Sequence, residues 1–245
     1  FDTTITGTTA DTEYTSNPEL VSATIGTNQA AKYSTYIFND AATAQTVQIG
    51  GIHVDNQYLN VNVRDKNGAT LVVNDGISSY LHNSMNVIAD KIVVSADNRE
   101  GIFADGANII INGDLELNAT GDNGKGLVAY LDSIIGSAGQ SSGTYSTASL
   151  KVDGTAKVET VNHAVQASGA DINITDVVDI HSSDGIAVRA MAYRTWTSDT
   201  TNPMYSEEKM ANVSIVGGKI VADKYDAIHN EGSNVYLNCV FILSN

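Results

Sequence analysis

The sequence predicts an all-β protein built as a three-sided parallel β-helix, a solenoid with one coil per repeat. One observation is a recurring pair of short alternating strands, of which Asn108–Leu117 is the clearest example. A second is the spacing of the repeats, whose first inward positions are predicted at 87, 109, 150, 172, 213 and 235, in steps of 22 or 41 residues. A third is another short strand about seven residues before each pair. Three strands in a coil of about 22 residues are typical of this fold. One coil alone cannot bury its apolar edge, so the coils must stack on one another.

The paired strands alternate apolar and polar residues, with a short corner between the two members of each pair. The predicted pairs are Val87/Ala89 with Ile92/Val94, Ile109/Ile111 with Leu115/Leu117, Leu150/Val152 with Ala156/Val158, Ile172/Ile174 with Val178/Ile180, Val213/Ile215 with Ile220/Ala222, and Val235/Leu237 with Phe241/Leu243. The additional strand is predicted at Gly101–Ala104, Gly126–Ala129, His163–Ala167, Gly185–Val188 and Ala227–Asn230.

Two features are expected to repeat from coil to coil. The inward file of one strand is predicted to contain Ile111, Val152, Ile174, Ile215 and Leu237. A small polar residue precedes the first strand in six coils, at Asn86, Asn108, Ser149, Asp171, Asn212 and Asn234. Stacked at one corner, these polar side chains would form a hydrogen-bonded ladder where the chain turns.

The chain is predicted to form one elongated unit with a cap at one end. Residues 1–46 are Thr-rich and polar, and we expect them to cover the open end of the solenoid, which otherwise exposes unpaired strand edges. Residues 47–245 are expected to form about nine coils. Two insertions, near 132–147 and near 192–211, account for the two steps of 41 residues and leave the coil at the same corner.

The composition excludes several classes of partner. The net charge is −15 with only 13 Lys plus Arg, which argues against nucleic acid and against an anionic membrane surface. The sequence contains no run of 18 apolar residues, so it predicts no membrane span. A single cysteine, Cys239, excludes an internal disulfide framework and Cys-rich zinc sites. Together with the abundance of Thr, Ser, Asn and Gly, this indicates a secreted protein of a bacterial surface.

Catalysis has to be considered because pectate-lyase-like enzymes, which cleave polysaccharides, share the predicted fold. The densest titratable cluster is Asp176, Asp179, His181 and Asp184, with Asp179 and His181 facing outward. Hydrolysis would need carboxylates converging in a groove, and a lyase would need an acidic Ca²⁺ site with a base. Acidic residues here are spread over corners, where Asp is common for turn reasons. We expect no catalytic site, no metal and no cofactor.

The histidines give no sign of nucleophilic catalysis. No Gly-x-Ser-x-Gly sequence occurs, and the five histidines are scattered over the coils. His53 and His229 are expected at comparable, solvated positions on the additional strand of their coils.

The two insertions are the predicted binding surface. The longer one contains the only tryptophan, and aromatic side chains can stack on sugar rings or anchor a protein contact. The predicted contact residues are Tyr145 from the shorter insertion and Tyr193, Arg194, Trp196 and Tyr205 from the longer one.

The coil Gly101–Leu117, with its echoes in Val165–Ile180 and Ile228–Leu243, resembles the repeat of autotransporter (type V secretion) passenger domains. The resemblance covers about residues 47–245. It implies a right-handed β-helix at the bacterial cell surface, acting as an adhesin that binds a host glycan or extracellular protein. The alternatives are self-association between copies of the chain, and polysaccharide cleavage on the same fold.

Overall fold

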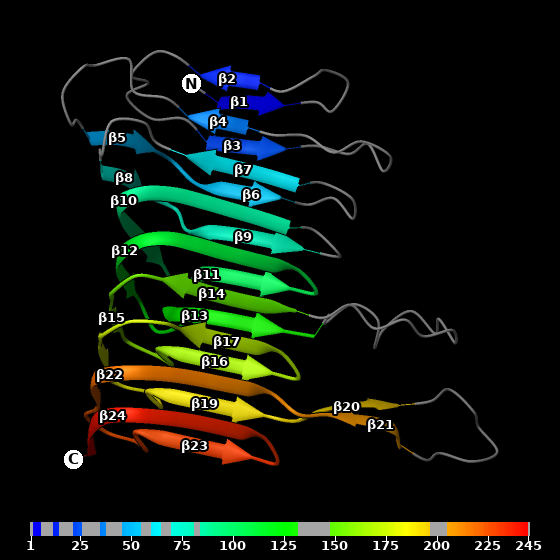
Figure 1. Cartoon of the computed structure of the whole chain (residues 1–245), viewed down its shortest axis with the longest axis vertical. Coiled ribbons are helices and arrows are strands. Elements are labelled where there is room, and N and C mark those ends of the chain that lie inside the picture. The colour runs from blue at the N-terminus through cyan, green and yellow to red at the C-terminus, as the bar shows by residue number, and fades with distance from the viewer. Residues whose placement is uncertain are drawn as a thin grey trace.

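The structure is a computed structural model that describes residues 2–5, 12–14, 22–25, 35–37, 46–54, 60–64, 70–80, 84–131, 148–196 and 205–244. Over these ranges the chain forms strands joined by turns and contains no helix, so none is present there that could cross a membrane. The strands stack one above another from the N-terminal to the C-terminal end (Figure 1). The predicted all-β organisation with parallel sheets is confirmed.

The first large sheet has nine parallel strands whose spatial order follows the sequence. These are β1 (Asp2–Ile5), β3 (Ser22–Ile25), β6 (Ile52–Val54), β9 (Ile77–Tyr80), β11 (Glu100–Asp105), β13 (Lys125–Tyr130), β16 (Val165–Ser168), β19 (Val188–Met191) and β23 (Ile228–Glu231). The chain therefore returns to this sheet again and again, at intervals that vary in length, and each time adds one strand beside the previous one.

The second large sheet has eleven strands and contains the predicted strand pairs. Its members are β5 (Thr46–Ile49), β7 (Asn60–Arg64), β8 (Thr70–Val73), β10 (Ser84–Asp97), β12 (Asn108–Thr120), β14 (Ser149–Asp153), β15 (Ala156–Thr160), β17 (Asp171–Ile174), β18 (Val178–Ser182), β22 (Asn212–Ala222) and β24 (Asn234–Ser244). In four places the two members of a pair are joined in one long strand. The long strand β12, for example, pairs first with β14 and then with β15.

The predicted inward file is confirmed by the strand register. Ile111 is in register with Val152, which is followed by Ile174 and then Ile215 on the neighbouring strands. These four side chains have no exposed surface. Leu237 continues the file in register with Ile215 but is only partly buried, because its strand β24 lies at the edge of the sheet.

Three predicted registers are wrong by two residues. Met85, not Val87, pairs with Ile109. In the nine-stranded sheet Val188, not Ile186, is in register with Val165. At the second strand of the pair, Val178 is opposite Gly218 instead of Ile220. A shift of two residues keeps every apolar residue on the same face, so hydrophobic alternation cannot detect it.

A fourth predicted register is wrong by one residue. Ile242, not Phe241, is opposite Ile220, so Phe241 and Leu243, which were predicted to face inward, point outward and are exposed. All four residues from Val240 to Leu243 are apolar, so alternation could not identify the inward face there.

The predicted polar ladder forms in five of the six coils. Ser149 donates to Asn108 Oδ1 at 2.7 Å, Asn212 donates to Asp171 Oδ1 at 2.7 Å, and Asn234 donates to Asn212 Oδ1 at 2.9 Å. Ser84, not Asn86, is in register with this line of residues. These side-chain bonds join neighbouring coils where each pair of strands begins.

The outer face of the nine-stranded sheet is less solvated than expected. His53 and His229 do lie on one register line, with Ser78, Phe103, Val128, Gln166 and Arg189 between them. Val128 is fully buried, however, and Gln166 is 4% exposed. The rings of Tyr80, Phe103 and Tyr130 pack edge to face along this side at centroid distances of 5.5 Å. Large side chains on neighbouring strands thus cover the smaller ones between them.

Two smaller sheets complete the described structure. Strands β2 (Thr12–Tyr14) and β4 (Thr35–Ile37) pair in parallel, whereas β20 (Tyr193–Trp196) and β21 (Tyr205–Lys209) pair antiparallel. Strands β1 and β3 fall within residues 1–46 and extend the nine-stranded sheet; the role of this segment as a cap stays a prediction. The insertion at 132–147 lies outside the described residues.

Candidate functional site

The described parts of the insertion at 192–211, which are residues 192–196 and 205–211, contain two antiparallel strands that project from the stack of parallel strands as a β-hairpin (Figure 1). Its base is well anchored, since the backbone of Ala192 donates to the carbonyl of Glu231, and Ala211 is fully buried. Tyr193 packs closely against Gly169, where an added Cβ would lie 2.4 Å from the Cβ of Tyr193. The hairpin is therefore a structured extension attached firmly to the core.

The backbone of this hairpin places several predicted contact residues. Trp196 and Tyr205 are register partners across the two strands, and Arg194 is opposite Glu208. Residues directly opposite in an antiparallel pair lie close enough for their side chains to interact. Tyr193 is half-buried at the base. Tyr145 lies outside the described residues, and so do the side chains of Arg194, Trp196 and Tyr205, so their roles stay predictions.

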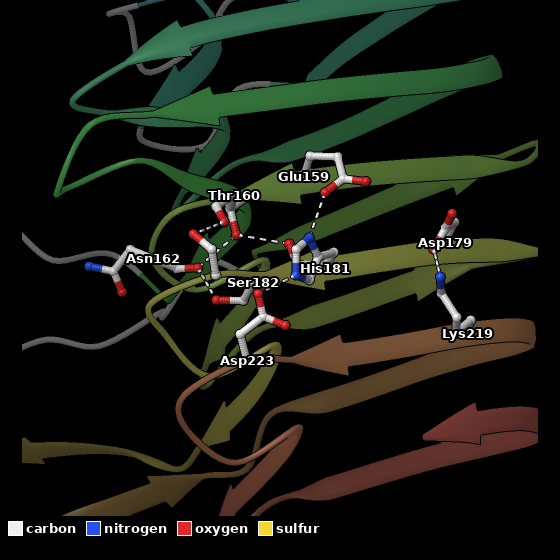
Figure 2. Close-up of polar contacts among 9 residues, drawn as sticks. Glu159, Thr160, Asn162, Asp179, His181, Ser182, Lys219 and Asp223 are labelled. Atoms are coloured by element: carbon white, nitrogen blue, oxygen red, sulfur yellow. Dashed lines mark hydrogen bonds and ion pairs between the residues drawn. The ribbon is translucent and has the colours of Figure 1, made fainter. Parts of the chain in front are cut away.

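A second candidate lies on the outer face of the eleven-stranded sheet, where His181 is held between two carboxylates (Figure 2). Its Nδ1 is 2.8 Å from Glu159 Oε2, and its Nε2 is 3.0 Å from Asp223 Oδ2. Glu159 is the register partner of His181 on the neighbouring strand β15. Asp223 lies in the turn after β22, where its amide donates to the carbonyl of Ser182.

The strand ends beside His181 are fixed by buried hydroxyl groups (Figure 2). Thr160 donates to the carbonyl of Asn162 at 2.7 Å, and Ser182 donates to the same carbonyl at 2.6 Å. Both side chains point into the core, with exposures of 6% and 0%. A buried hydroxyl without a partner would be costly, so these bonds favour one conformation of the turn after β15.

The carboxylates on both sides favour the charged form of His181. Partial burial alone would lower its pKa, but the hydrogen bonds and charges of Glu159 and Asp223 outweigh that effect, and the pKa lies above the ordinary value of 6.5. The imidazolium therefore crosslinks two coils and a turn at pH values where an ordinary histidine would be losing its proton.

We expect Asp223→Asn to lower the pKa of His181, because it removes the charge facing Nε2. Since the pKa of folded His181 is raised, its stabilising contribution is complete below about pH 6.5 and is lost as the pH rises through the folded pKa. An NMR titration of the ring protons measures the shift, and Asp184→Asn is a control because Asp184 pairs with Lys224 at 2.9 Å. An unchanged His181 pKa in Asp223→Asn would contradict this assignment.

The acidic cluster expected around His181 is divided differently. Asp179 pairs with Lys219 at 3.3 Å, Asp184 pairs with Lys224, and Asp176 accepts a hydrogen bond from the amide of Val177. The partners of His181 come instead from other coils. The Glu159 contact could have been found from the repeat, since the two residues are 22 apart, whereas Asp223 is 42 residues away in a turn.

Among the described residues, no group of three or more His, Cys, Asp and Glu side chains has the geometry of a metal site. At His181 the reason is plain, because the two carboxylates contact opposite nitrogens of one ring. A metal bound to either nitrogen would reach only one of them.

Glu159 also lines a groove of about 370 Å³ on the same outer face. The polar side chains in it are Ser95, Glu116, Asn118, Lys157 and Glu159, and Val93 adds an apolar surface. Glu116 is paired with Lys91 at 2.8 Å. Both carboxylates of the groove therefore already contact a basic side chain, Glu116 that of Lys91 and Glu159 that of His181.

Comparisons with known proteins add no relative. The chain matches no protein-family model, no curated protein and no solved structure. Inferences about its function therefore depend on its sequence and on the geometry of the described residues.

Proposed function

We propose that the chain is a right-handed three-sided parallel β-helix. Two features support this. The strands of the nine-stranded sheet follow one another in sequence order, and from β3 onward the chain passes through the eleven-stranded sheet between successive visits. The long strands contain two straight parts with a corner between them, which makes three strand positions in each coil.

On this scaffold we propose the function of a non-catalytic adhesin of the bacterial cell surface, similar to an autotransporter passenger domain, which binds a host glycan or an extracellular protein. The observation that carries the proposal is the β20–β21 hairpin, the antiparallel extension projecting from the parallel stack. Binding residues are disproportionately found on loops held by a rigid scaffold. The buried and hydrogen-bonded base of this hairpin fits that arrangement.

Trp196 and Tyr205 are the proposed anchors of the contact, and Tyr193, Arg194 and Tyr145 are further proposed contact residues. The register pairs the first two positions across the hairpin. Aromatic rings supply large contact areas with little loss of conformational entropy, and Trp, Tyr and Arg are enriched among the residues that dominate binding energy.

The test is a shortened hairpin in which the two residues Asn-Gly replace residues 195–207, so that a two-residue turn connects Arg194 to Glu208. These two residues are register partners, so a two-residue turn can close the strands while the buried base stays intact. We expect an unchanged melting temperature and loss of binding on an array of glycans and extracellular-matrix proteins.

Point variants locate the contact more finely. Trp196→Ala and Tyr205→Ala should each weaken binding at least about tenfold. Tyr225→Ala is the matched control, since Tyr225 is an exposed aromatic residue of the body, with 57% of its surface accessible. Full binding by the shortened protein would refute the proposal and point to the flat outer faces of the sheets.

Polysaccharide cleavage is a second candidate, favoured by the groove that contains Glu116 and Glu159. Release of oligosaccharides from an acidic polysaccharide, abolished by Glu159→Gln, would establish it.

Self-association is distinguished from adhesion and from polysaccharide cleavage by analytical ultracentrifugation, in which the adhesin proposal predicts a monomer at all concentrations.

A further inference from the structure

Gln166 on β16 and Arg189 on β19 are register neighbours on the outer face of the nine-stranded sheet. Gln166 is almost completely buried, with 4% of its surface exposed, and 29% of the Arg189 side chain is exposed. Neither side chain is needed by the inward core. Their position differs from that of the hairpin tip and of the His181 cluster, so this surface has a chemistry of its own.

Each of the two residues has one buried polar atom without a hydrogen-bond partner among the described residues. Arg189 Nε and Gln166 Oε1 are buried and make no hydrogen bond. Arg189 forms a loose ion pair with Glu231, whose Oε1 is 3.7 Å from Nη2. That same oxygen is 2.7 Å from Nε2 of His229. A guanidinium offers five N–H donors, and Nε of Arg189 is one that has no acceptor.

His163 places a second donor directly against this guanidinium. Its Nδ1 accepts a hydrogen bond from the amide of Ile186 at 3.0 Å, so the proton of the neutral ring is on Nε2. Burial, and then the charges of Arg189 and Lys125, lower the pKa of His163 to about 4, and the ring is neutral at pH 7. Its Nε2 lies 3.5 Å from Nη1 of Arg189. Two donors therefore face each other without an acceptor between them.

The surroundings add positive charge to this pair of donors. Lys125 contributes to the electrostatic environment of both His163 and Tyr130, and its Nζ is 3.5 Å from Glu100 Oε1. One oxygen atom can lie about 2.9 Å from both facing nitrogens without moving either of them, because they are 3.5 Å apart. An oxyanion is the acceptor that charged donors bind most strongly.

We propose that Arg189 and His163 form a binding site for the oxyanion of an acidic sugar, either a carboxylate or a sulfate ester. The oxyanion accepts from Arg189 Nη1 and His163 Nε2, and Arg189 supplies the compensating charge. The site is independent of the hairpin and goes beyond the adhesin proposal, which does not specify a charged ligand.

The test is an NMR titration of the ¹⁵N-histidine-labelled protein with three probes: glucuronate, glucose 6-sulfate and glucose. We expect the ring signals of His163 to shift saturably with at least one of the two anions and not with glucose. A response to glucuronate alone identifies a carboxylate ligand, and a response to the sulfate alone identifies a sulfate ester. Ring signals that respond to none of the probes, or equally to glucose, overturn the proposal.

Variants assign the binding to Arg189. Arg189→Gln should lower the affinity at least tenfold, and Arg189→Lys should lower it less, because lysine keeps the charge but loses the planar fork. The matched control is Arg99→Gln, which removes an arginine whose Nη1 pairs with Asp75 at 3.1 Å. If Arg189→Gln does not fold, the lysine variant alone decides. Wild-type affinity in a folded Arg189 variant overturns the proposal.

Discussion

Ile174→Asp is expected to lower the free energy of unfolding by about 4 kcal/mol or more. Ile174 has no exposed surface and stands in the middle of the inward file, between Val152 and Ile215. Aspartate at this position would place a carboxylate in an apolar interior, where an unpaired charge is among the most costly substitutions. Because each coil is stable only through its neighbours, the loss should extend to both adjacent coils.

Asn173→Asp is the matched control, since it introduces the same charge one residue away on the exposed face of the same strand. Its free energy of unfolding should stay within about 0.5 kcal/mol of the parent value. Ile174→Ala adds an intermediate case, with an expected loss of about 2–5 kcal/mol from the cavity it leaves. Urea denaturation measures all three variants. Equal midpoints for Ile174→Asp and Asn173→Asp would contradict the assignment of Ile174 to the inward face, and a lower midpoint for Asn173→Asp would mean that the two faces are exchanged.

The sequence allowed the faces of most strands to be predicted but not every register. Val152 and Ile174 were placed correctly, because apolar and polar residues alternate strictly around them. Val87 and Ile220 were aligned two residues away from their true partners. A shift of two residues keeps the same face buried, so only the length of the corner distinguishes the alternatives. That length varies, since the register also shifts between Ile88 and Lys91.

The candidate sites were predictable to different extents, because the repeat aligns only those residues that lie within the repeated strands. The repeat of 22 residues was sufficient to bring Glu159 beside His181, but it says nothing of Asp223, which reaches the ring from a turn. The arrangement of His163 and Arg189 depends on the register of β16 and β19, where the predicted alignment was wrong. The hairpin could be foreseen only as an insertion, because its antiparallel pairing arises outside the repeat.

The two glycines at the corner of β22 differ in whether the fold has room for a side chain. Gly217 and Gly218 are adjacent in the corner of β22, and both have positive φ, at 70° and 96°. A Cβ on Gly218 would lie 2.0 Å from the carbonyl oxygen of Val178 on the neighbouring strand, whereas a Cβ on Gly217 would meet nothing closer than 3.5 Å. Cys239, one coil further on, has a φ of 56° at the position equivalent to Gly217. An L-residue can therefore occupy that position.

Gly218→Ala is accordingly expected to cost on the order of 3 kcal/mol, because the backbone of β18 or β22 must move to relieve the overlap and the strained φ remains. Gly217→Asn should cost less than about 1 kcal/mol, since asparagine tolerates left-handed backbone and the space is open. Urea denaturation of the two variants, with hydrogen exchange at the β18–β22 pairing, measures the difference. If Gly218→Ala is as stable as Gly217→Asn, the close approach of these two strands at the corner is refuted.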